Sequence, residues 1–151
     1  MNYPCIVYSV ILIVIAIVDA KSRLIPNLML IIAGMVMLPI VISTDALVSG
    51  FTGSCIGFGI FCILFLIAPS KVGAGDVKLA GLIGFIVGFP MVFLSIALTM
   101  IISGIGCMFM VSLKRYQTSG SIPYAPFLCT GAIVTLWAGD LMVNWYWGLL
   151  V

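Results

Sequence analysis

The chain has 151 residues, of which 64% are hydrophobic and 7% are charged. Ordinary soluble domains are about a quarter charged, so this composition, with a mean hydropathy of +1.41, excludes a soluble protein and indicates an integral membrane protein. The net charge of +2 and the lack of basic blocks argue against binding to nucleic acid. The sequence has no histidine and no CxxC pair, so we expect no metal and no cofactor.

Charged residues divide the chain into apolar stretches. A membrane-spanning helix needs about 20 apolar residues to cross a hydrocarbon core of about 30 Å, so the first three stretches each predict one span. The fourth would form a helix of roughly 50 Å, and Gly88-Phe89-Pro90 interrupts it, which predicts two spans with the first one short. The last span is expected from about Pro126 to Trp147. The uncharged stretches are Met1–Val18, Leu24–Thr44, Ala46–Ser70, Leu79–Leu113 and Tyr116–Gly139.

The basic residues predict how the helices are oriented. All six fall after the first, third and fifth predicted helices. With six spans these loops share one side, and the positive-inside rule assigns that side to the cytoplasm. Five spans would move Lys114 and Arg115 to the opposite side. We therefore predict an all-α, polytopic membrane protein with six transmembrane helices, both termini on the outer side, and residues 1–151 forming a single membrane-embedded domain.

Two of the four aspartates, Asp19 and Asp76, fall on this predicted cytoplasmic side. The helix that begins at Asp76 has only about 14 residues, or roughly 21 Å, so we expect Asp76 to start inside the membrane and to line a wet pocket. A carboxylate beside hydrocarbon needs a partner or a function. Two adjacent carboxylates do not both ionise easily, so one keeps a proton and acts as an acid while the other polarises a water molecule.

The same charges allow a purely structural interpretation. The two aspartates could instead pair with Lys21, Arg23 or Lys78 as anchors at the membrane interface, and charge placement alone does not choose between the two interpretations. Asp45 is expected in a loop, outside this chemistry. Close helix packing is expected at two GxxxG pairs, Gly53/Gly57 and Gly84/Gly88.

Three segments resemble the signatures of the type IV prepilin peptidases. Asp19 is followed six residues later by Ile25-Pro26-Asn27, which resembles the first signature. Gly73-Ala74-Gly75-Asp76-Val77-Lys78-Leu79 resembles the second, GxGDxKL. The segment Ile122–Leu128, with Pro123 and Pro126, resembles the IPxxPFL stretch that opens the last helix of these enzymes.

This resemblance implies an aspartic endopeptidase with Asp19 and Asp76 as its catalytic pair. Such enzymes remove the basic leader from type IV prepilins or pseudopilins at the cytoplasmic face of the inner membrane. Supporting or substrate-binding roles would fall to the other signature residues, with Lys78 either tuning the pair or meeting an acidic substrate group, or acting only as an anchor. These residues are Gly73, Gly75, Lys78, Ile25, Pro26, Asn27, Pro123 and Pro126.

Long members of the family carry an N-terminal methyltransferase region, usually with paired CxxC motifs. This chain begins at the first peptidase helix, so it resembles the short form of tight-adherence (Flp-type) pilus systems, and methylation by this chain is not expected. Locally, Pro26 is expected in the first turn of a helix and Asn27 is expected to bind exposed backbone donors there. The alternative functions are an archaeal-type preflagellin peptidase and a small transporter or assembly scaffold.

Overall fold

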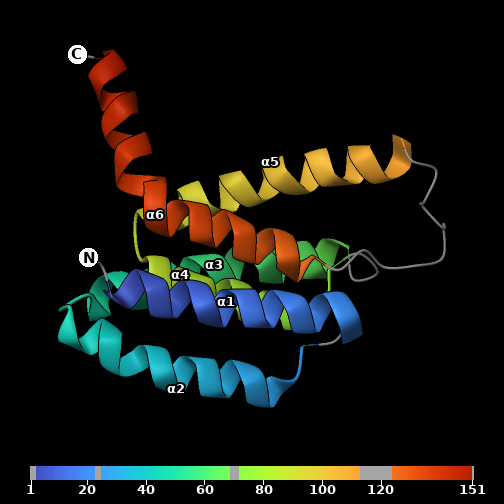
Figure 1. Ribbon diagram of the computed structural model, residues 1–151, viewed down its shortest axis with the longest axis horizontal. Coiled ribbons are helices and arrows are strands. Elements are labelled where there is room, and N and C mark those ends of the chain that lie inside the picture. The colour runs from blue at the N-terminus through green and yellow to red at the C-terminus, as the bar shows by residue number, and fades with distance from the viewer. Residues whose placement is uncertain (1–2, 23–24, 69–71, 113–123, 151) are drawn as a thin grey trace.

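The computed structural model describes residues 3–22, 25–68, 72–112 and 124–150. The described chain contains six α-helices, as predicted (Figure 1). The break predicted at Gly88-Phe89-Pro90 is confirmed, because one helix ends at Val87 and the next begins at Met91. The helices are α1 (Tyr3–Ser22), α2 (Asn27–Ser43), α3 (Leu47–Ile67), α4 (Ala74–Val87), α5 (Met91–Ser112) and α6 (Ala125–Leu150).

The helices have the lengths and surfaces of a multi-pass membrane protein. Among the described residues, four helices are long and apolar enough to cross a bilayer, namely α1, α3, α5 and α6. The helix α2 is apolar but shorter, with 17 residues. Large apolar side chains such as Ile13, Met35 and Leu66 are exposed on the outside of the bundle, where hydrocarbon would replace water. Figure 1 shows both termini at one end of the bundle, opposite the end where α1 connects to α2.

The short helix α4 occupies the centre of the bundle. It has 14 residues, and its buried residues are Asp76, Val77, Leu79, Ala80, Gly81, Ile83, Gly84 and Ile86. At 1.5 Å per residue it is about 21 Å long, which is less than the roughly 30 Å core of a bilayer. The helices α2, α3, α5 and α6 all contact it. Because protein rather than lipid surrounds α4, its first turn can carry the carboxylate of Asp76.

Glycines bring the backbones of α3 and α4 into direct contact, as the GxxxG pairs predicted. A Cβ atom on Gly84 would overlap the carbonyl oxygen of Gly53, and one on Gly53 would overlap the carbonyl oxygen of Gly84. Gly88 also lies against Gly53, and Gly57 lies against the backbone of Ala80. Small residues of this kind allow two helices to pack closely where there is no hydrophobic force between them.

The two turns at the end of the bundle near the termini are also determined by local chemistry. Asp45 has a φ of 52° in the turn between α2 and α3, which confirms the loop position predicted for it; aspartate tolerates this left-handed conformation better than most residues. Gly88, with a φ of 73°, ends α4. Beyond it, the N–H of Phe89 donates to the carbonyl of Ser49 at 3.0 Å, and the Ser49 hydroxyl donates to the carbonyl of Phe89 at 2.9 Å. These bonds attach the start of α5 to α3.

The close contact between α3 and α4 should make Gly84 intolerant of a methyl group. Gly84→Ala is expected to lower the free energy of unfolding by about 1 to 3 kcal/mol, the usual range for overpacking. Gly59→Ala is the matched control, because it lies in α3 with open space around its Cβ position. Unfolding in mixed detergent micelles, followed by circular dichroism, would measure both variants. Equal stability of the two would contradict the proposed role of the glycine contact.

Candidate active site

Asp19 lies in the last turn of α1 and is only 5% exposed. The backbone N–H of Ala125, the first residue of α6, lies beside its carboxylate. The first N–H groups of a helix have no partner within the helix and carry partial positive charge, so they favour an anion. The Oδ2 atom of Asp19 is buried and has no hydrogen-bond partner among the described residues.

Asp76 lies in the first turn of α4 and is 9% exposed. The N–H of Gly73 donates to its Oδ2 at 3.0 Å, and the N–H of Asp76 donates to the carbonyl of Gly73, also at 3.0 Å. This reciprocal pattern is a capping arrangement that holds the carboxylate over the start of the helix. A Cβ atom at Gly73 would lie 3.3 Å from Asp76 Oδ2, so glycine leaves the carboxylate room.

The fold brings the two carboxylates close enough to interact electrostatically. Both also act on the thiol of Cys129, one turn into α6. The helices α1, α4 and α6 therefore converge on one buried acidic cluster, although Asp19 and Asp76 are far apart in the sequence. We call these two residues the aspartate pair.

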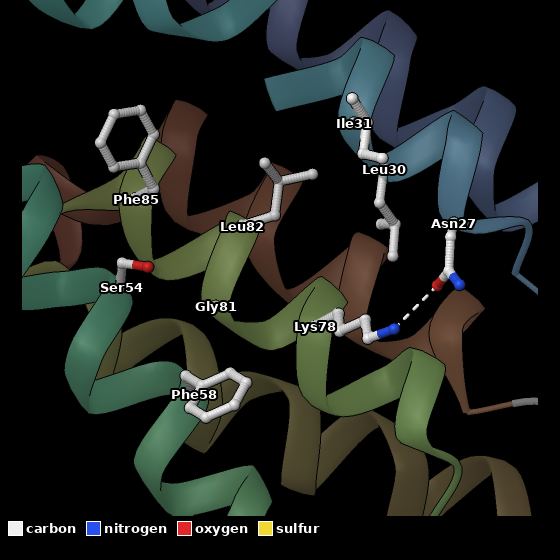
Figure 2. Close-up of a pocket in the computed structure, with 9 residues that line it drawn as sticks. All are labelled: Asn27, Leu30, Ile31, Ser54, Phe58, Lys78, Gly81, Leu82 and Phe85. Carbon is white, nitrogen blue, oxygen red and sulfur yellow. Dashed lines mark hydrogen bonds between the residues drawn. The ribbon is translucent and has the colours of Figure 1, made fainter. Parts of the chain in front are cut away.

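The anchoring interpretation is not supported by the lysines that the structure describes. Neither Lys21 nor Lys78 forms an ion pair with an aspartate, while Arg23 lies outside the described residues. The Lys78 ammonium instead donates to Asn27 Oδ1 at 2.8 Å (Figure 2). Residues two apart on a helix do not face each other, so Lys78 points away from Asp76 and towards α2.

The Ile25-Pro26-Asn27 segment is placed beside the start of α4, but one of its expected roles is wrong. Pro26 precedes the first turn of α2 as its N-cap residue, and Asn27 is the first helical residue. No side chain caps this helix; the Asn27 amide oxygen accepts from Lys78, so it does not satisfy backbone donors. Ile25 packs against Gly75, where a Cβ would lie 3.4 Å from the Cβ of Ile25.

The start of α6 contributes more than the sequence indicated. Pro126 is in its first turn, and its carbonyl accepts from the Thr130 hydroxyl at 3.0 Å, while Pro123 lies outside the described residues. The N–H of Ala125, which lies beside Asp19, was not among the predicted site groups. The sequence feature that pointed to this N–H group was the predicted start of a helix at this segment, because the first N–H groups of every helix lack a partner within the helix. Among the described residues, no three His, Cys, Asp or Glu side chains form a metal-ligand group.

The chain is similar to known bacterial proteins over most of its length. It is 27% identical over 146 residues to a prepilin leader peptidase/N-methyltransferase of Bacillus subtilis (strain 168), covering 95% of this chain and 59% of that protein. It is 28% identical over 109 residues to a protein of the same description from Legionella pneumophila, covering 71% of this chain and 38% of the relative. The chain thus spans less than two thirds of these relatives. No solved structure gives a significant match.

The family assignment rests on a match to a family model. Residues 6–111 match the model of the type IV leader peptidase family. The matched segment contains both aspartates, the Ile25-Pro26-Asn27 segment and the whole of α4. Because this match covers well over half of its length, the chain belongs to the type IV leader peptidase family.

Proposed function

We propose that this protein is an aspartic endopeptidase that cleaves the basic leader peptide from type IV prepilins or pseudopilins. The observation that carries the proposal is the aspartate pair, two buried carboxylates from α1 and α4 that interact electrostatically. Family membership and the similarity to proteins described as prepilin leader peptidase/N-methyltransferase support the same activity. We propose that the peptidase unit comprises residues 1–151.

The proposed chemistry uses the pair as one unit. One carboxyl keeps a proton and donates a hydrogen bond to the carbonyl of the scissile peptide bond, while the other carboxylate accepts a proton from the attacking water molecule. The backbone N–H of Gly73 holds the Asp76 side chain in place, and the N–H of Ala125 lies beside Asp19. Buried polar atoms almost always have partners, so a shared proton or the attacking water would satisfy the unpaired Oδ2 of Asp19.

The proposed location follows from the distribution of charge. We place the protein in the cytoplasmic (inner) membrane with the aspartate pair facing the cytoplasm and both termini outside, because the positive-inside rule assigns the basic loops to the cytoplasm. The leader of the substrate would then meet the enzyme at this face, and its apolar segment would pack beside the helices. Among pilin classes, we propose Flp-type precursors as substrates.

A transporter or scaffold remains the competing function of a different class. Ion-coupled transporters hold their ionisable residues near the middle of the bilayer, typically at interrupted helices. Here Asp19 lies in the last turn of α1 and Asp76 in the first turn of α4. Both carboxylates are therefore at helix ends, which favours chemistry at the membrane boundary over transport through the centre.

Removing one ionisable carboxyl should stop peptide hydrolysis. Asp19→Asn and Asp76→Asn keep side-chain size, and each is expected to reduce cleavage by at least about a hundredfold, as loss of acid–base catalysis does. The double variant should be no worse than either single variant, because residues that act as one unit do not contribute additively. Conversion of precursor to mature pilin, followed by gel shift at equal expression, measures this.

Asp45→Asn is the matched control for this experiment. Asp45 is exposed in the turn between α2 and α3, at the opposite end of α2 from the Asn27–Lys78 bond, so its substitution should leave cleavage unchanged. Substantial processing by either variant of the aspartate pair would refute the aspartic mechanism and favour the scaffold.

The proposed topology can be tested with single cysteines in a variant that lacks the five native cysteines. Asp45→Cys should react with a membrane-impermeant maleimide added to intact cells, because the turn between α2 and α3 is predicted to face outward. Lys21→Cys, exposed at the end of α1, should react only after the cytoplasmic membrane is opened. The reverse pattern of labelling would overturn the proposed orientation. This measurement concerns the orientation and not the proposed chemistry.

A further inference from the structure

A groove lies between α2, α3 and α4, on a different side of α4 from the aspartate pair. Its volume is about 600 Å³. Most of its lining is apolar or small, and Figure 2 shows these side chains along its walls. The lining residues are Asn27, Leu30, Ile31, Ser54, Phe58, Lys78, Gly81, Leu82 and Phe85.

The groove has one charged end. The Lys78 ammonium donates to Asn27 Oδ1 at 2.8 Å there, and Figure 2 shows this pair beyond Leu30 and Leu82. An ammonium has three donors, and this single bond leaves capacity for an anion. All four aspartates of the chain lie in described residues, and none of them lines the groove. An anion that met Lys78 would therefore have to come from another molecule.

The size and position of the groove favour a chain-like ligand. From Lys78 to Phe85 it follows two turns of α4, or about 10 Å along the helix axis. A volume of about 600 Å³ is typical of small-molecule sites. A transmembrane helix with side chains is about 10 Å wide, so a helix could only lie across the opening and could not occupy the groove itself. Ile31 and Phe58 line the groove and are exposed, so it opens at the surface of the bundle that lipid would cover.

We propose that this groove binds one anionic phospholipid. An acyl chain would lie against Leu30, Phe58 and Leu82, and the phosphate would accept hydrogen bonds from the Lys78 ammonium and from the Asn27 amide N–H₂ group. The charged end is at the start of α4, where a lipid headgroup belongs if the helix crosses from the membrane surface. Basic pockets between helices at the cytoplasmic side bind anionic headgroups in this way. This proposal does not depend on the peptidase activity.

Native mass spectrometry of the purified protein tests the lipid specificity. The probes are phosphatidylglycerol and phosphatidylcholine with identical acyl chains, offered in equal amounts to one sample. The wild-type protein should retain about tenfold more phosphatidylglycerol, because the quaternary ammonium of phosphatidylcholine would place a like charge near the Lys78 ammonium. Lys78→Met should abolish the preference, and Lys78→Arg should keep it. Because each ratio is measured within one folded population, a lower yield of folded protein cannot imitate the result.

The matched control is Lys21→Met, which removes an exposed lysine from the end of α1 and should leave the preference intact. An excess of inorganic phosphate should not displace the lipid, because the acyl chain supplies part of the binding. Equal retention of both lipids by the wild type, displacement by phosphate, or an unchanged preference in Lys78→Met would each overturn the proposal.

Photo-crosslinking distinguishes lipid from a protein occupant. Ile31 lines the groove and is exposed, so benzoylphenylalanine at this position can reach a ligand without disturbing the core. In membranes that contain a pilin precursor, adducts with phospholipid would support the proposal. Adducts mainly with the precursor would overturn it and identify the groove as a docking surface for the substrate.

Discussion

The backbone contact between α3 and α4 is the constraint on which the rest of the structure depends. Gly53 and Gly84 approach so closely that neither position has room for a Cβ atom. Lipid provides no hydrophobic force between helices, so this close packing is what holds α4 against its neighbour. A helix of 14 residues is too short to cross a bilayer of ordinary thickness unaided. Held by α3 and covered by α2, α5 and α6, it can begin inside the protein and carry a carboxylate.

The central position of α4 separates two polar sites by helix geometry. Asp76 faces α1 and α6, where it meets Asp19, whereas Lys78 faces α2, where it meets Asn27. If the lysine faced the aspartate pair, it would neutralise one carboxylate and favour ionisation of both. The observed arrangement instead keeps two carboxylates together without a described lysine beside them. That is the condition under which one of the two retains a proton, as the proposed hydrolysis requires.

Much of the fold could be predicted from the sequence because charge and hydrophobicity are strongly segregated along it. The uncharged stretches and the Gly88-Phe89-Pro90 break predicted the six helices, and the GxxxG pairs predicted close packing at the glycines where α3 and α4 meet. The proximity of Asp19 and Asp76 followed only from resemblance to a family, since charge placement alone left anchoring open. The Ala125 N–H at Asp19 and the Lys78–Asn27 bond could not be predicted, because each depends on how separate helices pack.

The two proposals together constrain how a substrate could reach the aspartate pair. If a phospholipid fills the groove between α2, α3 and α4, a leader peptide cannot approach Asp76 through that side. We propose that it approaches around the first turns of α4 and α6, where Gly73 and Gly75 have no side chains of their own. Gly75 lies against Ile25, and the N–H of Gly73 donates a hydrogen bond to Asp76. Movement of the Ile25-Pro26-Asn27 segment would therefore alter access to the aspartate pair. A bound lipid would hold Asn27 and Lys78 together. It would then stabilise the packing of α2 against α4 on the side of α4 that faces away from the aspartate pair.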